Sequence, residues 1–298
     1  MTTPRDILRR IRRIEVRTRR RVADRYAGAY HSVFKGRGME FDEVREYLPG
    51  DDIRAIDWNV TARMGHPFIK KFVEERELTL MLLADLSAST RFGSTTALKR
   101  DLIVELVALL AFSAVRNNDR AGLILFTDGV ERYVPPRKGA SHALRIIRET
   151  LGGIPRGVGT RLAPALDYLN RVQPRRTVAF LLSDFIDGAP AAESERALAI
   201  AARRHDLVAV CVRDRLEQAW PSVGVVRWRD AETGRLRLAD TADARVRRAL
   251  TSAQAEARDA LLHRLAARRI DRIELDTARP YDAALQRFFR ERERRLGR

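Results

Sequence analysis

The chain has 298 residues and a mass of 34.0 kDa. An apolar fraction of 45% with only 17 Gly and 11 Pro excludes a disordered or collagen-like chain, and the length predicts a sizeable core. Lys and Arg outnumber Asp and Glu by 57 to 40, which gives a net charge of +17. The single cysteine, Cys211, excludes an internal disulfide and a cysteine-only zinc site.

The positive charge is concentrated at the two ends of the chain. Residues 1–25 hold ten Arg against three acids, and residues 287–298 hold six Arg against two. Such ends can bind acidic proteins, nucleic acid or anionic lipid, or they can be solvated helix faces. No apolar run approaches the roughly 20 residues needed to span a membrane. We therefore expect a cytoplasmic protein without a membrane span, with contact at the inner membrane surface as an open alternative.

Two different patterns follow each other along the chain. Residues 4–23 predict a basic amphipathic helix, and residues 30–77 are polar and turn-rich, with short strands expected near 41–48 and 67–75. From residue 78, apolar runs typical of buried strands alternate with helical patterns. The expected strands are 78–84, 121–126, 130–134, 177–182, 207–212 and 270–275, and the expected helices are 96–116, 140–151, 162–171, 191–204, 242–267 and 281–295.

This alternation predicts an α/β fold with a doubly wound, mostly parallel sheet and helices on both faces. We expect two parts, residues 1–77 and residues 78–298. Residues 214–241 interrupt the second part as an excursion, with a hairpin that turns at 232–234. In such sheets ligands bind at the carboxyl ends of the strands, where the strand order reverses.

A polar motif ends the first buried strand. Asp85, Ser87 and Ser89 are alternate residues and could turn three oxygen groups toward one point. Two hydroxyls and a carboxylate suit Mg²⁺ or Mn²⁺ and do not suit zinc or copper. The alternative is a polar strand exit that caps the next turn, since Ser and Asp do this routinely.

Two later residues strengthen the metal interpretation. A glycine-rich loop presents the hydroxyl of Thr160 before a helix, and Asp184 follows the next core strand. In a doubly wound sheet that strand lies beside the strand ending at Asp85. The five residues therefore surround one crevice in the predicted fold: Asp85, Ser87, Ser89, Thr160 and Asp184.

This set resembles the metal-ion-dependent adhesion site of von Willebrand factor A domains. The resemblance covers about residues 78–298. It implies that Ser87, Ser89 and Thr160 touch the metal directly, while the two aspartates act through water. It also implies one open coordination position, which a carboxylate of the partner fills. Two Asp-Gly pairs near the motif, at 128–129 and 187–188, are interpreted as turns.

An acidic, turn-rich stretch precedes the first buried strand and runs from Gly36 to Glu75. It can be an ion-pair cluster that pins an irregular segment, with Ile53, Ile56 and Trp58 packed on the sheet, or a surface for docking a partner. The residues assigned to that surface are Glu40, Asp42, Arg45, Asp51, Asp52, Arg54, Asp57 and Trp58.

Together with the Asp85–Ser89 motif, this stretch is similar to the bacterial family called domain of unknown function fifty-eight. Members pair such a segment with a von Willebrand A-like domain and are associated with MoxR-type AAA+ ATPases. The resemblance implies a metal-dependent partner of such an ATPase, in an adaptor or assembly role.

Other chemistries lack their motifs. The chain has no G-x-x-x-x-G-K-[ST] loop, no G-x-S-x-G elbow and no H-E-x-x-H sequence, so we assign no catalytic residue. Three hypotheses remain, in this order: a Mg²⁺-dependent protein-binding module, binding of nucleic acid or acidic surfaces by the Arg-rich ends, and a Mg²⁺-dependent phosphohydrolase using Asp85 or Asp187.

Overall fold

The computed structural model describes residues 4–21, 27–34, 43–49, 53, 56, 58–71, 77–95 and 97–296. Internal contacts divide the chain into two compact units. The larger unit comprises Met1–Phe34 together with Leu78–Arg298, and the smaller unit comprises Lys35–Glu77.

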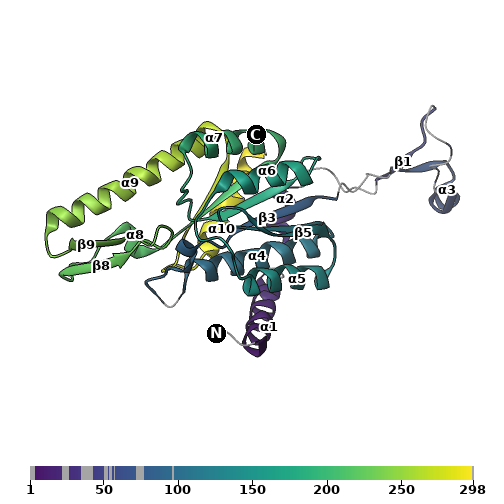
Figure 1. The fold of residues 1–298 in the computed structure, drawn as a ribbon. Helices are drawn as coiled ribbons and strands as arrows, with labels where there is room; N and C mark the ends of the chain where they lie inside the picture. Colours follow the sequence, from purple (N-terminus) through teal and green to yellow (C-terminus); the bar gives the residue numbers. More distant parts are fainter. Residues whose placement is uncertain are drawn as a thin grey trace. The chain divides into compact units, whose positions relative to one another are not determined.

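A six-stranded sheet forms the centre of the larger unit (Figure 1). Its strands are β3 (Thr79–Asp85), β4 (Arg120–Phe126), β5 (Val130–Arg137), β6 (Val178–Ser183), β7 (Asp206–Arg213) and β10 (Asp271–Asp276). They lie in the order β10-β7-β6-β3-β4-β5. β5 runs antiparallel to β4, and the other neighbouring pairs are parallel. The predicted α/β fold with a doubly wound, mostly parallel sheet is confirmed.

Both faces of the sheet are buried. In β3, Leu80 and Leu82 belong to one apolar cluster, while Met81 and Leu83 belong to a second cluster, and all four are fully buried. Successive side chains of a strand point to opposite faces, so a strand covered on both sides needs a continuous apolar run. That is why residues 78–84 could be recognised as a central strand.

Helices cover the two faces separately. The first cluster includes residues of α1 (Pro4–Arg21), α2 (Ala27–Phe34), α4 (Lys99–Arg116), α5 (Ala140–Gly152) and α10 (Asp282–Leu296). The second includes residues of α6 (Leu162–Val172), α7 (Ala191–Arg204) and α9 (Ala244–Ala267). Two short helical turns, η3 (Ala88–Arg91) and α8 (Arg215–Gln218), follow β3 and β7 at their carboxyl ends.

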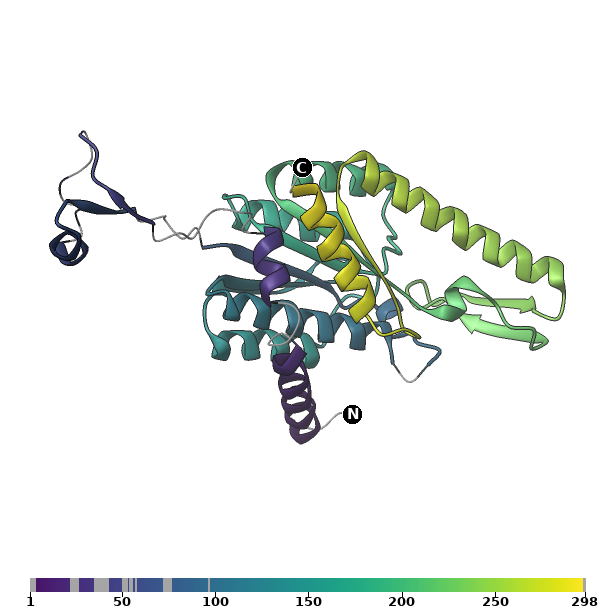
Figure 2. The ribbon, with the colours of Figure 1, turned by 180° about the vertical axis from the view of Figure 1, so that it is seen from behind.

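The first two helices belong to the main core, so the expected division after residue 77 differs from the one that the contacts make. Ile11 and Ile14 of α1 are buried, and Tyr30 of α2 is completely buried. The ring of Phe34 contacts Phe180 of β6 at 5.7 Å and Phe289 of α10 at 6.4 Å between centroids, and α2 and α10 lie side by side in Figure 2. These contacts between distant residues stabilise α2, whose eight residues are too few to show a clear helical period.

The smaller unit contains a strand pair and a short helix. β1 (Glu43–Glu46) pairs antiparallel with β2 (Phe68–Lys71), inside the two predicted strand regions, and α3 (Trp58–Met64) was not predicted. Ile53 and Trp58 are 65% and 68% exposed, so neither side chain is buried within the smaller unit, and their packing on the six-stranded sheet stays a prediction. A two-stranded pair offers too little surface to bury them.

One docking residue besides Trp58 can be located, because Arg45 lies in β1 and donates to the carbonyl of Glu46. The other residues assigned to the docking surface lie outside the described residues: Glu40, Asp42, Asp51, Asp52, Arg54 and Asp57.

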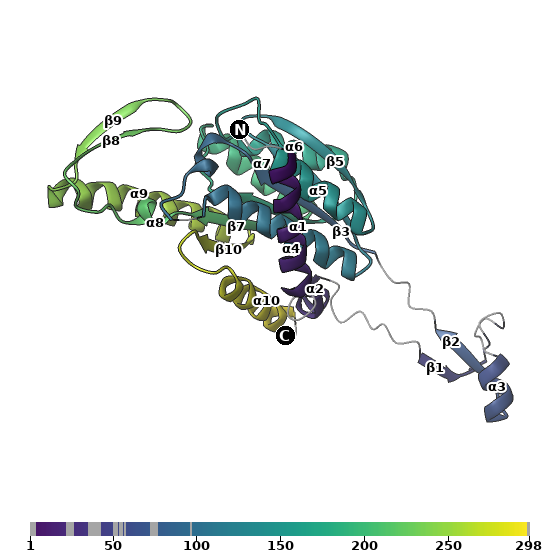
Figure 3. The same cartoon turned by 90° about the horizontal axis from the view of Figure 1, so that it is seen from below.

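The excursion after β7 contains the predicted hairpin. β8 (Val225–Arg229) and β9 (Leu236–Asp240) pair antiparallel and precede α9, and Figure 3 shows this hairpin standing apart from α9, with its turn toward the sheet. Over the part of the chain that the structure describes, no helix is both long and apolar enough to cross a bilayer.

Candidate functional site

The five predicted site residues lie at the carboxyl ends of β3 and β6. Asp85 is the last residue of β3, and Asp184 directly follows β6. β3 and β6 are parallel neighbours, and the chain order reverses between them, since β4 and β5 lie on one side and β7 and β10 on the other. This position is where open α/β sheets bind their ligands.

Asp85 is completely buried and fully hydrogen-bonded. Its Oδ1 accepts from the backbone N–H of Ser87 at 2.8 Å, and its Oδ2 accepts from the hydroxyl of Ser183 at 2.6 Å. Burial, reinforced by the charge of Asp184, raises the pKa of Asp85 to about 7. The Oγ atoms of Ser87 and Ser89 lie 3.0 Å apart in the turn that follows. The motif therefore places two hydroxyls beside a carboxylate that burial makes costly to ionise.

The loop that carries Thr160 is fixed by the β4–β5 turn. The Oε1 atom of Glu131 accepts from the backbone N–H groups of Arg156 and Gly157, at 3.1 and 2.8 Å, and from the hydroxyl of Thr127 at 2.6 Å. Gly157 packs so closely that an added Cβ would lie 2.4 Å from the Oγ1 of Thr127. The glycine therefore permits an approach that no other residue allows.

Two further hydrogen bonds tie the loop to its neighbours. The N–H of Arg161 donates to the carbonyl of Thr127 at 2.9 Å, and the N–H of Ala88 donates to the carbonyl of Val158 at 2.9 Å. Thr160 is thereby held against both the β4–β5 turn and the Ser87–Ser89 segment.

A buried lysine contacts Asp184. The Nζ of Lys99, the first residue of α4, lies 2.6 Å from Oδ2 of Asp184 and 2.5 Å from Oε1 of Glu217 in α8. The Lys99 side chain is 0% exposed. Burial alone would lower its pKa, but the charges of Asp184 and Glu217 raise the pKa above its usual value. Lys99 therefore stays protonated and neutralises one carboxylate of the site.

The backbone beside Asp184 is in an unusual conformation. Phe185 has a φ of 59°, in the left-handed region that a bulky side chain disfavours. The turn is held because the N–H of Phe185 donates to the Ser183 hydroxyl at 2.9 Å and the N–H of Ile186 donates to Oδ1 of Asp184 at 3.2 Å. Strain of this kind is concentrated at functional sites in folded proteins.

The turn of the β8–β9 hairpin adds an acidic residue to the crevice. Glu232 accepts from the Thr160 hydroxyl at 2.5 Å and from the Thr160 N–H at 3.2 Å, and it also hydrogen-bonds the Ser89 side chain. Burial, together with the charge of Asp184, raises the pKa of Glu232. Glu232 lies 72 residues from Thr160, so sequence reasoning identified only its turn and missed its contact with the site.

The five predicted residues thus belong to one cluster of polar side chains at the carboxyl ends of β3 and β6, together with Ser183, Lys99 and Glu232. Asp85 and Asp184 feel each other's charge, and Glu232 connects Ser89 to Thr160. The five residues offer only oxygen, with three hydroxyls and two carboxylates, a set that fits a hard divalent cation. Within the described ranges, no group of three or more His, Cys, Asp or Glu side chains could hold a metal. A cation here would therefore depend on the hydroxyls.

The two Asp-Gly pairs form turns, as predicted. At the first, the N–H of Thr127 donates to the carbonyl of Gly129 at 2.9 Å between the antiparallel strands β4 and β5. At the second, Asp187 accepts from the N–H of Ala189 at 2.9 Å and from the hydroxyl of Ser194.

The fold and this cluster of side chains define an α/β domain with oxygen-bearing groups at the strand-order reversal. The model of the family described as protein of unknown function DUF58 matches residues 43–260, and the chain belongs to this family. The uncharacterised protein Rv1480 of Mycobacterium tuberculosis is 35% identical over 229 residues, which are 76% of this chain and 71% of that protein. The uncharacterised protein YeaD of Bacillus subtilis is 31% identical over 106 residues, which are 35% of this chain and 24% of that protein.

Similar solved structures include two bacterial proteins. The conserved hypothetical protein BatB of Bacteroides thetaiotaomicron has a TM-score of 0.47 and 14% identity, covering 74% of this chain and 98% of BatB. A von Willebrand factor type A protein of Catenulispora acidiphila has a TM-score of 0.42 and 13% identity, covering 77% of this chain and 44% of that protein.

Proposed function

We propose that this chain is a non-enzymatic protein-interaction module that binds an acidic group of its partner through a Mg²⁺ or Mn²⁺ ion. The observation that carries the proposal is the clustering of the Ser87, Ser89 and Thr160 hydroxyls with the carboxylates of Asp85 and Asp184 at the carboxyl ends of β3 and β6. Asp85 and Asp184 would hold the ion with these hydroxyls. The bound ion would supply a positive centre for an incoming carboxylate.

Hydroxyl ligands favour an ion that binds a carboxylate of the partner. They carry no charge, and Lys99 already neutralises Asp184, so a divalent cation at the site would keep part of its positive charge. An anionic group from outside is then attracted more strongly than it would be to a carboxylate-saturated ion. This chemistry suits reversible binding of Asp or Glu side chains.

The state of the acidic and basic groups supports a non-catalytic role. A phosphohydrolase would need Asp85 or Asp187 as a nucleophile or base, whereas the proposed function uses the Asp85 carboxylate to hold the ion. Lys99 is held protonated between two carboxylates, so it has no lone pair to attack a substrate.

For the partner, we propose a MoxR-type AAA+ ATPase or its client protein, in an adaptor or assembly role, in the cytoplasm. The family resemblance supports this class of partner. The exposed Trp58 of the smaller unit supports a second contact surface, because exposed tryptophans are typical interface anchors.

Two buried threonines give a sharp test of the metal. Thr160→Val removes the proposed ligand, while Thr150→Val removes a buried hydroxyl that only donates to the carbonyl of Ile146. Titration with Mn²⁺, followed by calorimetry, should show an affinity at least tenfold weaker for Thr160→Val and unchanged for Thr150→Val. Equal affinities for the two variants would contradict the proposal.

A pull-down then tests the partner. The tagged wild-type chain would be used with Mg²⁺ and with EDTA, and the two threonine variants would be compared with it. Nucleic acid would be measured in each eluate. We expect an AAA+ ATPase that is recovered only with Mg²⁺ and is lost with Thr160→Val. Recovery that ignores EDTA would contradict metal-dependent binding.

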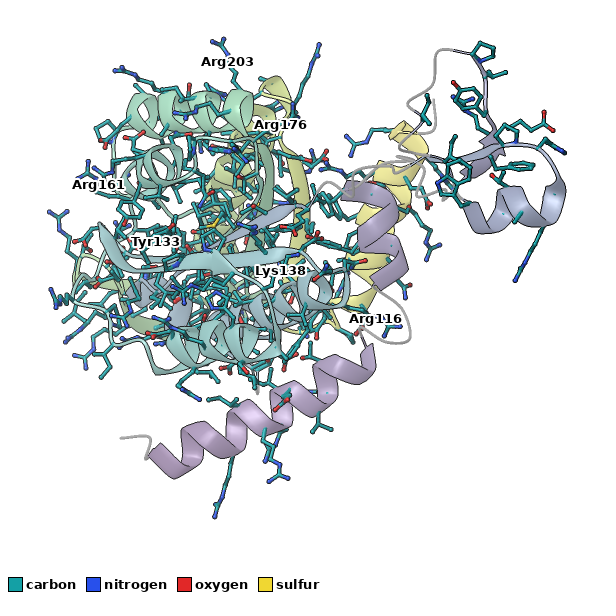
Figure 4. All side chains as sticks on the ribbon, turned by 90° about the vertical axis from the view of Figure 1, so that its right-hand side faces the viewer. Arg116, Tyr133, Lys138, Arg161, Arg176 and Arg203 are labelled. Carbon is teal, nitrogen blue, oxygen red and sulfur yellow. The ribbon has the colours of Figure 1, made fainter. Side chains whose placement is uncertain are left out.

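Binding of nucleic acid is the alternative outcome of that experiment. Exposed arginines occur on the outward face of α1, at Arg12 and Arg13, and the larger unit also exposes Arg116, Arg161, Arg176 and Arg203 (Figure 4). Nucleic acid recovered without a protein partner, released by salt but not by EDTA, would favour these arginines over the crevice.

A further inference from the structure

We propose that Glu232 is the carboxylate that this chain supplies to its own metal site, so that an acidic group of the partner must displace the β8–β9 hairpin before it can bind. This inference rests on the proposed function. It adds a residue to the site and states what controls access to it.

Glu232 contacts the proposed metal site through the hydroxyls of that site, because within the described residues the acidic side chains alone do not form a metal-binding group. One carboxylate oxygen lies 2.5 Å from the Thr160 hydroxyl, and the other lies 3.2 Å from the Thr160 backbone nitrogen. The carboxylate also hydrogen-bonds Ser89. Glu232 therefore contacts two of the three hydroxyls proposed to bind the metal.

The charges around Glu232 favour the binding of a cation. The negative charge of Asp184 acts on Glu232, and within the described residues no ion pair joins Glu232 to Lys, Arg or His. A half-buried carboxylate that accepts hydrogen bonds only from neutral donors is stabilised when a cation binds beside it. A divalent cation among the hydroxyls would supply that charge and bind Glu232.

Hydrogen bonds within the turn of the β8–β9 hairpin fix the backbone at Glu232. Oδ1 of Asp230 accepts from the N–H of Glu232 at 3.1 Å and from the N–H of Thr233 at 2.8 Å. The N–H of Gly234 donates to the Asp230 carbonyl at 2.9 Å, with Gly234 at a φ of 70°. The turn is therefore ordered by its own hydrogen bonds, which keeps the entropic cost of placing Glu232 small.

The strands of the hairpin are exposed, so its release would be inexpensive. Val225, Leu236 and Leu238 are 71%, 57% and 70% exposed, and Figure 3 shows the hairpin standing apart from α9. Segments with little buried apolar area open at low free energy. A partner carboxylate could then compete with Glu232 without disturbing the core of the sheet.

The test uses the hairpin itself as the competing ligand. A labelled peptide with the sequence of residues 228–236, Trp-Arg-Asp-Ala-Glu-Thr-Gly-Arg-Leu, would be titrated against the full chain and followed by fluorescence anisotropy. The proteins would be the wild type, Glu232→Ala, and Glu256→Gln, which removes an exposed carboxylate of α9. Each would be measured with Mg²⁺ and with EDTA.

We expect the peptide to bind Glu232→Ala at least tenfold more tightly than the wild type, because the wild-type site is occupied by its own carboxylate. EDTA should abolish this binding, as should replacing the peptide's Glu with Gln. Glu256→Gln should behave as the wild type. Hydrogen exchange of residues 230–235 in the wild type should slow when Mg²⁺ is added, independently of any peptide.

The outcomes separate this inference from the proposed function. Mn²⁺ binding that depends on Thr160, with equal peptide affinity for the wild type and Glu232→Ala, would overturn the inference alone. Mn²⁺ binding that is the same for the wild type and Thr160→Val would overturn the proposed function and this inference together.

Discussion

The crevice has two halves that balance charge in different ways. In one half, Asp184 and Glu217 share the ammonium group of Lys99 at 2.6 and 2.5 Å. In the other half, hydroxyl and backbone N–H groups contact Asp85 and Glu232, and within the described residues neither carboxylate forms an ion pair. One half therefore contains the Lys99 ammonium group, whereas the carboxylates of the other half have only hydroxyl and backbone N–H groups as partners.

This difference separates a structural role from a binding role. A buried carboxylate with its own ammonium partner is already neutralised and gains less from a further cation. A buried carboxylate held by neutral donors gains most when a cation arrives. Lys99 is therefore expected to matter for stability, whereas the hydroxyl-lined half is expected to matter for binding.

The largest effect is expected from Lys99→Met. The substitution leaves Asp184 and Glu217 without their cation, so the free energy of unfolding should fall by about 3–5 kcal/mol. Arg116→Met, at the exposed end of the same helix, should change it by less than about 0.5 kcal/mol. Urea unfolding measures both. If Mg²⁺ takes over part of the lysine's role, it should stabilise Lys99→Met more than the wild type. Equal stability of Lys99→Met and Arg116→Met would show that the two carboxylates do not need Lys99 as their cation.

The second-largest effect on the free energy of unfolding is expected at the opposite end of the sheet, where stability depends on pH. His205 precedes β7, is 1% exposed, and has no hydrogen-bond partner for either ring nitrogen among the described residues. Burial, with Arg204 and Arg176 nearby, lowers the pKa of His205 to about 4 from an ordinary value near 6.5. Between these values the unfolded chain binds the extra proton, so stability falls as pH decreases from about 6.5 to 4.

Over that range the wild type should lose about 2–3 kcal/mol more stability than His205→Leu, which cannot titrate there. Denaturant unfolding at pH 7 and pH 4 measures this difference. His263→Leu, which removes an exposed histidine of α9, should retain the wild-type profile. A wild type and a His205→Leu variant that lose stability in parallel would show that His205 is not buried in its neutral form.

A pair of glycines tests the hydroxyl-lined half directly. A Cβ at Gly157 would lie 2.0 Å from Oδ1 of Asp128 and 2.4 Å from Oγ1 of Thr127. Asp128 is exposed and can move, but Thr127 is completely buried, so Gly157→Ala should cost about 1–3 kcal/mol and weaken Mn²⁺ binding. At Gly159 the nearest atom would lie 3.9 Å away, and Gly159→Ala should be close to neutral. Equal effects of the two variants would indicate that the loop is not held by the β4–β5 turn.

The smallest effect on stability is expected in the smaller unit. Trp58 is 68% exposed, so Trp58→Ala should change the free energy of unfolding by less than about 0.5 kcal/mol, measured by thermal unfolding. The same variant should weaken recovery of the partner if Trp58 belongs to a docking surface. An unfolding temperature that falls sharply would instead assign Trp58 to a core.

Much of this protein was determined by local sequence patterns. The continuous apolar run at 78–84 predicts a strand buried on both faces, and alternation with helical periods predicts a parallel sheet. A parallel sheet places the carboxyl ends of neighbouring strands at one edge, so the sequence alone predicts that Asp85 and Asp184 lie close together. These inferences succeed because strand burial and the direction of strand ends depend on short segments.

What depended on distant residues could not be predicted. The role of Lys99 requires Asp184 and Glu217, which lie 85 and 118 residues away, and nothing around Lys99 indicates burial. The packing of α2 requires Phe180 and Phe289, and the position of Glu232 requires a hairpin to fold back onto Thr160. The sequence by itself determined the strands, the sheet and the group of hydroxyls and carboxylates at its edge. Only the tertiary structure decided which charges are neutralised and which carboxylate sits in the site, because charge balance in a buried crevice depends on groups that meet only when the chain is folded.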